Sequence, residues 1–267
     1  SEMCIRDRIG TLNTVIFCPE DLQLIKGTPS GRRRFLDMEI SQTSATYYHQ
    51  LMQYNRLLQQ RNAVLKEYRG KNTIPLEEWD LQLADMASFI VKKRLESLKK
   101  INLLIDLMNR KLTGGLENLT IGYEQPYMDN GSLEYTKEGF YERIKAALPQ
   151  DRHRLSTSVG PHRDDLRFFS DAMDLKKFGS QGQQRTAVLS LKLSELEFIK
   201  SEVGEYPVLL LDDVLSELDE SRRTNLLQFI HKRIQTFITT TDIHDFKDLK
   251  SVQFISCEGG QVQYGQP

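Results

Sequence analysis

The chain has 267 residues, of which 39% are hydrophobic and 27% charged, and its formal net charge is −1. These values are typical of a globular protein with one large or two modest domains. No apolar run approaches the length of a membrane span. Cys4, Cys18 and Cys257 match neither a disulfide framework nor a metal-ligand spacing, which fits a reducing compartment. We therefore expect a cytoplasmic protein that does not contact a membrane.

The charge is distributed unevenly along the chain. Residues 31–112 contain fifteen Lys/Arg and nine Asp/Glu, a net charge of +6. Residues 156–267 contain thirteen and seventeen, a net charge of −4. The basic part is a candidate nucleic-acid face, and the acidic part is a candidate catalytic lobe.

The first thirty residues are those of a chain expected to begin partway through a domain. Residues 1–8 have no apolar core and are not a signal peptide, and we expect them to be foreign to the natural chain or disordered. Thr14–Cys18 is a predicted buried strand. Because nothing before it can pair with it, we expect the chain to begin inside a domain.

Two long helices are predicted next, from about Ala45 to Tyr68 and from about Glu77 to Leu112. In the second, apolar positions step by three and four, which is typical of a coiled-coil-like seam. Only Arg94 interrupts that seam. The short break between the helices favours an antiparallel hairpin. At 1.5 Å per residue the second helix spans roughly 50 Å, so we expect an arm rather than a core element.

Basic residues of this region are candidate contacts to a DNA backbone. Arginines open the helix that begins near Gly31, and lysines follow along the second long helix. The candidates are Arg32, Arg33, Arg34, Lys92, Lys93, Lys99 and Lys100. Contact with phosphates and exposure to solvent next to acidic neighbours are both consistent with the sequence.

A pair of adjacent carboxylates follows a short apolar run. Pro207 introduces Val208–Leu211, which is short enough for a strand covered on both faces. Asp212 and Asp213 come directly after it, where open α/β sheets place ligand chemistry. Such a pair suits Mg²⁺ on a nucleotide phosphate, with the second carboxylate orienting water. A solvated acidic turn is the alternative.

A glycine-containing turn precedes the helix predicted to run to about Glu202. Ser180 is a suitable N-terminal cap for that helix, and Gly179 and Gly182 let the backbone approach a ligand closely. Free amides and a hydroxyl at a helix N-terminus form an anion site that matches a γ-phosphate. An ordinary loop and cap is the alternative.

The order of these segments resembles that of ABC-type ATPases. Ser180–Arg185 is similar to their signature motif, Val208–Asp213 to the Walker B strand and Ser216–Asp219 to the D-loop. The resemblance is closer still to the RecF family of bacterial recombination mediators, and it extends from about residue 10 to residue 257. Further segments that carry it are Phe17–Leu22, Gly31–Asp37, Gln60–Asn62, Gly160–Leu166 and Thr239–Thr241.

The resemblance implies an α/β fold, namely an ABC-type ATPase head lobe with an inserted α-helical, coiled-coil-like hairpin arm, as in SMC proteins. Residues 9–30 would be a remnant of the N-terminal ATPase lobe. Residues 31–155 would form a mainly helical arm domain, and residues 156–267 would form the C-terminal ATPase lobe.

The resemblance also implies roles for single residues. Asp212 would hold Mg²⁺, and Asp213 would stand at the position of the catalytic base. Ser180, Gly182, Gln183 and Asp219 would meet the nucleotide of a second subunit. Where ABC ATPases have a switch histidine, Thr241 or Asp242 would sense the γ-phosphate.

The implied function is an ATP-dependent homodimer that binds DNA at single-strand/double-strand junctions. It would act with RecR and RecO to place RecA at gaps. No Gly-x-x-x-x-Gly-Lys-[Ser/Thr] phosphate loop occurs in the sequence. We therefore expect a C-terminal fragment without the Walker A lobe that is inactive alone. A non-catalytic DNA-binding or scaffold module of SMC type is the alternative.

Overall fold

The computed structural model describes residues 12–69, 75–115, 117–127, 135–241, 246, 252–259 and 261–265. The helices are η1 Pro19–Leu22, α2 Gln23–Lys26, α3 Pro29–Thr43, α4 Ala45–Glu67, α5 Glu77–Thr113, α6 Lys137–Ala146, α7 Leu148–Arg154, η2 Pro161–Arg163, α8 Leu175–Phe178, α9 Gln181–Val203, η3 Leu215–Glu217 and α10 Glu220–Ile230. The strands are β1 Thr14–Phe17, β2 Leu119–Glu124, β3 Asp165–Ser170, β4 Met173–Asp174, β5 Val208–Asp212, β6 Thr236–Thr239, β7 Phe254–Glu258 and β8 Gln261–Gly265.

The strand expected near the start of the described chain is present and lies beside the strand that ends at Asp212. The parallel sheet has the order β1-β5-β6. Phe17 is paired with Leu211, and Asp212 with Thr239. Three parallel strands therefore bring their carboxyl ends to one edge, which is the edge where ligand sites form in open α/β sheets.

The expectation that the β5 strand is covered on both faces is wrong for this structure. Alternate residues of a strand point to opposite faces, and Leu209 and Leu211 are each 1% exposed. On the other face the register aligns Ile16, Leu210 and Phe237. Leu210 is half-buried, whereas Ile16 and Phe237 are exposed.

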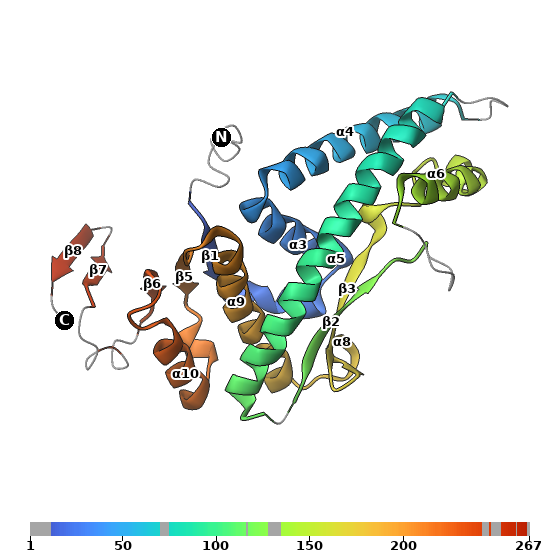
Figure 1. Ribbon diagram of the computed structural model, residues 1–267. Coiled ribbons are helices and arrows are strands. Elements are labelled where there is room, and N and C mark those ends of the chain that lie inside the picture. The colour runs from blue at the N-terminus through green and yellow to red at the C-terminus, as the bar shows by residue number, and fades with distance from the viewer. Residues whose placement is uncertain are drawn as a thin grey trace.

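Helix α5 runs through the centre of the molecule (Figure 1). Its seam residues from Ala84 to Met108 are buried. It packs against α4, α6 and α9 and against β2. The expectation of an arm outside the core is therefore wrong for this helix, because its apolar seam is covered by several different elements rather than by one partner helix. No helix of the described residues is long and apolar enough to span a bilayer.

Arg94, the residue that interrupts the α5 seam, is 2% exposed and forms the centre of a buried polar cluster. Its guanidinium pairs with Asp37 of α3 and with Asp164 at 2.8 and 3.4 Å. It also donates to the carbonyl of Pro161 at 2.7 Å. Burial of an arginine requires such paired carboxylates. This seam position therefore attaches α5 to α3 and to the loop around residues 161–164.

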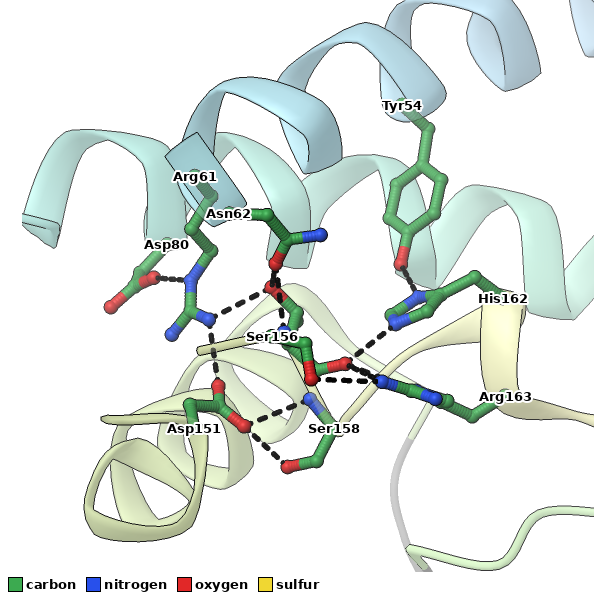
Figure 2. A network of polar contacts seen from close by, with 10 residues as sticks. Tyr54, Arg61, Asn62, Asp80, Asp151, Ser156, Ser158, His162 and Arg163 are labelled. Carbon is green, nitrogen blue, oxygen red and sulfur yellow. Dashed lines mark hydrogen bonds and ion pairs between the residues drawn. The ribbon is translucent and has the colours of Figure 1, made fainter. Parts of the chain in front are cut away.

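A second buried arginine, Arg61 of α4, joins the same loop region to the helices (Figure 2). It donates to Asp80 at 2.6 Å, to Asp151 at 2.7 Å and to Thr157 Oγ1 at 2.9 Å. Nearby, His162 Nδ1 lies 2.6 Å from the Tyr54 hydroxyl (Figure 2). Burial lowers the pKa of His162 to about 4, so the imidazole is neutral near pH 7 and acts as a structural hydrogen-bonding group.

Candidate functional site

The two adjacent carboxylates lie at the carboxyl edge of the parallel sheet. Asp212 is the last residue of β5, and both Asp212 and Asp213 are exposed. Asp213 has a positive φ of 52°, a conformation that aspartate tolerates better than most residues. The turn that follows is closed by Ser216, whose hydroxyl donates to the Asp213 carbonyl at 2.8 Å.

Thr239, at the end of β6, links the two aspartates. Its hydroxyl donates to Asp212 Oδ1 at 2.6 Å and accepts from the Asp213 backbone N–H at 3.0 Å. One side chain therefore orients the Asp212 carboxylate and fixes the turn that carries Asp213. Sequence reasoning did not assign Thr239 a role in the site. The feature of the sequence that could have identified Thr239 is its position at the end of the next parallel strand, where a side chain can face the carboxylates.

The donor atoms at this edge fit a magnesium ion that takes most of its ligands from water and phosphate. Carboxylate oxygens are the protein ligands that Mg²⁺ prefers, and it commonly binds through one or two carboxylates plus water and substrate phosphates. Among the described residues no group of three or more His, Cys, Asp or Glu side chains could hold a metal. Asp212 and Asp213 could hold such an ion beside a phosphate, because two carboxylates match this donor set.

The turn before α9 has the predicted cap in reciprocal form. Ser180 Oγ accepts from the Gln183 N–H at 3.2 Å, and Gln183 Oε1 accepts from the Ser180 N–H at 3.0 Å. This capping box leaves the serine hydroxyl hydrogen available to an external acceptor. Ser180, Gln181 and Gly182 are exposed, so the first amides of a 23-residue helix face solvent. Such an end favours an anion.

The two glycines of this turn differ in what the fold requires of them. A Cβ on Gly179 would lie 2.6 Å from the carbonyl oxygen of Leu175, closer than real contacts allow. A Cβ on Gly182 would meet only Ser180 Oγ, at 3.9 Å. The fold therefore requires glycine at 179, whereas the intramolecular packing would accept a side chain at 182.

Asp219 is the N-cap of α10. Its carboxylate accepts from the Arg222 backbone N–H at 3.0 Å and forms an ion pair with the Arg222 side chain. The hydrogen bond from the Arg222 backbone is the main cause that lowers the pKa of Asp219. The carboxylate remains exposed. Within the subunit it stabilises the start of α10.

The two residues expected to sense a γ-phosphate follow β6. Thr241 is exposed and lies two residues beyond the strand end. Asp242 lies outside the described residues.

The basic candidates of α3 differ in their burial and in their contacts. Arg32 is 3% exposed and makes a two-point contact with Asp165 at 2.7 and 2.9 Å. The half-buried Arg33 donates to the Asp164 carbonyl at 2.6 Å. Arg34 is exposed.

The α5 lysines differ in their contacts as well. Lys93 pairs with Glu96 at 2.8 Å, and Lys100 pairs with Glu202 at 2.5 Å. Lys92 and Lys99 are exposed and make no ion pair with any residue that the structure describes. A spacing of seven residues places these two on one face of the helix.

The signature turn and the carboxylates belong to different elements, α9 and β5, although Arg185 and Val188 of α9 line one pocket with Val214 and Leu218, which follow Asp213. Figure 1 shows α8, which leads into Ser180, well apart from β5 and β6. Within the described part of the chain no hydrogen bond joins Ser180 to Asp212 or Asp213. Ser180 and the two aspartates are therefore held by separate sets of hydrogen bonds.

Comparison with known proteins identifies relatives along nearly the whole chain. No protein-family model matches. The DNA replication and repair protein RecF of Alkaliphilus oremlandii is 50% identical over 244 residues, which cover 91% of this chain and 66% of that protein. RecF of Halalkalibacterium halodurans is 44% identical over 265 residues, which cover 97% of this chain and 71% of that protein. The chain thus spans about two thirds of the length of these relatives.

A solved structure has the same fold. The structure of the recombination mediator protein RecF-ATP in the RecFOR pathway superposes with a TM-score of 0.86 at 37% identity, covering 97% of this chain and 69% of that one. This similarity confirms the ABC-type ATPase fold and the family that the motifs indicated. The chain belongs to the RecF family of DNA replication and repair proteins.

Proposed function

We propose that this chain forms part of an ATP-controlled DNA clamp, in which each subunit supplies one half-site to a nucleotide held between two subunits. The observation that carries this proposal is the separation of the capped α9 N-terminus from the carboxylate edge within one chain. In the proposed dimer, one γ-phosphate would meet the carboxylate edge of one subunit and the α9 N-terminus of the other. The RecF-ATP structure supports ATP as the ligand.

The carboxylate edge would act on the nucleotide of its own subunit. Asp212, oriented by Thr239, would hold Mg²⁺, which when bound neutralises charge on the phosphates. Asp213 would accept a hydrogen bond from the attacking water and hold it in line. The hydroxyl of Thr241, and Asp242 beyond it, would face the γ-phosphate.

The signature turn would act on the nucleotide of the partner subunit. The Ser180 hydroxyl and the first amides of α9 would donate to the γ-phosphate. Gln183 would hold Ser180 through the capping box, and Asp219 would meet the same interface. Phe178, next to this turn, is 71% exposed, which supports burial of this surface in a dimer.

The test of this proposal uses the glycine pair. A chimera that adds to this chain the part of A. oremlandii RecF outside the matched residues, called here the completed chain, should dimerise when ATP is added. Gly182→Ala should fold normally, since alanine favours a helix, but should weaken the ATP-dependent dimer by about tenfold or more because its methyl group enters the phosphate site. Light scattering with and without ATP measures this.

Gly179→Ala is the matched control. Its methyl group collides with the Leu175 carbonyl, so it should lower thermal stability whether or not ATP is present. If Gly182→Ala dimerised with ATP as well as the unchanged protein, the signature turn would not contact the nucleotide of the partner.

DNA would bind along the exposed basic residues. Arg34, Lys92 and Lys99 are the first candidates because their side chains are exposed. Arg32 and Arg33 are engaged in contacts within the fold, and Lys93 and Lys100 each pair with a glutamate. Gap recognition with RecO and RecR, followed by RecA loading, is the role that the family relationship supports. A single-strand/double-strand junction is the proposed DNA substrate.

The double variant Lys92→Ala/Lys99→Ala should weaken binding of the completed chain to a gapped duplex and reduce the salt slope of binding by about 2, since each phosphate contact contributes about 0.9. Lys100→Ala is the control, because Lys100 is already paired with Glu202 and its loss should change the slope less. Fluorescence anisotropy across a salt series measures both. An unchanged slope in the double variant would show that these lysines only face solvent.

A further inference from the structure

Glu117, in the connection between α5 and β2, reaches the signature turn from 66 residues away in sequence. Its Oε1 accepts from the side-chain Nε2 of Gln183 at 3.0 Å. Its Oε2 accepts from the Ser170 hydroxyl at the end of β3, also at 3.0 Å. Both carboxylate oxygens are therefore used, and the side chain is half-buried.

This contact determines how the Gln183 amide is oriented. Its oxygen accepts from the Ser180 N–H and its nitrogen donates to Glu117. The reverse orientation would place the amide oxygen against a carboxylate oxygen and the amide nitrogen against an N–H. Only the observed orientation satisfies both partners. Glu117 thus holds the capping box in the form that leaves the Ser180 hydroxyl free to donate.

The segment that carries Glu117 is itself held on α5 and α9. The Glu117 carbonyl accepts from Asn109 Nδ2 at 2.9 Å, and Asn109 Oδ1 lies 3.1 Å from the Ser190 hydroxyl of α9. The next residue, Asn118, donates to Asp171 at 2.7 Å. The carboxylate therefore sits in a fixed place relative to the first turn of α9, and that place is set by the C-terminal end of α5.

We infer that Glu117 is a positioning residue of the signature half-site, which it sets through Gln183 and Ser180. The inference rests on the proposed function, since it assumes that Ser180 meets a phosphate of the partner subunit. Through Glu117, the geometry of the capped turn also depends on the position of α5, the helix that carries the exposed Lys92 and Lys99. A displacement of the C-terminal end of α5 would move Glu117 and loosen the capping box.

The experiment is a double-mutant cycle on positions 117 and 183 in the completed chain, with the ATP-dependent dimer as the readout. Gln183→Glu places two carboxylates against each other and should weaken that dimer by roughly tenfold, the scale of one charge-assisted hydrogen bond. The exchanged pair Glu117→Gln/Gln183→Glu restores a donor facing an acceptor, and the carboxylate introduced at position 183 can still accept from the Ser180 N–H. It should return the dimer to within about threefold of the unchanged protein.

Two further measurements separate positioning from folding and from failure of the proposed function. Glu117→Ala should weaken the ATP-dependent dimer, whereas Asn102→Ala, which removes the two hydrogen bonds between α5 and Ile121 of β2, should weaken it less at a similar loss of thermal stability. If the unchanged completed chain formed no dimer with ATP, the proposed function would fail and the inference with it. If that dimer formed but the exchanged pair were no better than Gln183→Glu alone, only the role of Glu117 would be overturned.

Discussion

Replacement of Arg94 by methionine is expected to lower the free energy of unfolding by about 3–5 kcal/mol, the range found when one partner of a buried ion pair is removed. Methionine keeps the length and the helix propensity of the side chain, so the loss comes from the charges left behind. Asp164 is fully buried, and without Arg94 its carboxylate would keep the Tyr123 hydroxyl as a donor but lose the cation that pairs with it. Urea denaturation at pH 8 measures the change.

The same variant should be less destabilised in acid. Burial raises the pKa of Asp164, and Arg94 opposes that shift, so loss of Arg94 raises the folded-state pKa further. A carboxyl group whose folded pKa lies above its unfolded pKa contributes stability that is present below the unfolded pKa and lost as the pH rises. The difference between variant and unchanged protein should therefore shrink as the pH falls from 8 toward 4.

Lys92→Met is the control, since it makes the same replacement two residues away on the exposed face of α5. It should change stability by no more than about 0.5 kcal/mol. Equal stability of Arg94→Met and Lys92→Met would mean that the buried carboxylates become protonated or hydrated at little cost, and the cluster around Arg94 would then not hold the helices together.

The local elements could be predicted because each rests on neighbouring residues. Ser180 caps α9 through residues three positions away, and Pro207 introduces a strand whose apolar run is continuous. The strand at Thr14 was also predicted, but its partner was not, since its pairing with β5 joins residues nearly two hundred positions apart. Periodicity gives the type of an element and carries no information on distant pairing.

The polar contacts between different helices and strands could not be predicted from the sequence for the same reason. In the sequence Arg94 interrupts an apolar seam, and only the structure shows that Asp37 and Asp164 pair with it. Arg32 looked like a phosphate contact, because the sequence does not reveal that Asp165 lies beside it. Thr239 and Glu117 each act on a motif that lies far away in the sequence. The motifs alone indicated the chemistry, and the supporting residues became visible only in the fold.

Asp213→Asn in the completed chain is expected to slow ATP hydrolysis by about 100-fold or more, the lower range for loss of a general base, and to prolong the ATP-held dimer. Asparagine accepts a positive φ as readily as aspartate, and the hydrogen bond from the Asp213 backbone N–H to Thr239 does not involve the side chain. The turn should therefore be retained while the amide can no longer accept a proton. Phosphate release measures the rate, and light scattering after removal of free ATP measures the lifetime of the dimer.

Asp171→Asn is the matched control, because Asp171 is also exposed with a positive φ of 45°, and the asparagine oxygen can still accept the hydrogen bonds from Asn118. It should leave hydrolysis unchanged. The 267-residue chain by itself should release no phosphate, since its sequence contains no phosphate loop to hold ATP beside Asp213. If Asp213→Asn hydrolysed ATP at the unchanged rate, the attacking water would be oriented by another group, and Thr239, which contacts both aspartates, would be the next residue to replace. A slow rate combined with a short-lived dimer would instead mean that the Asp213 carboxylate is needed to close the dimer, so the two readouts together separate the chemistry of Asp213 from a structural role.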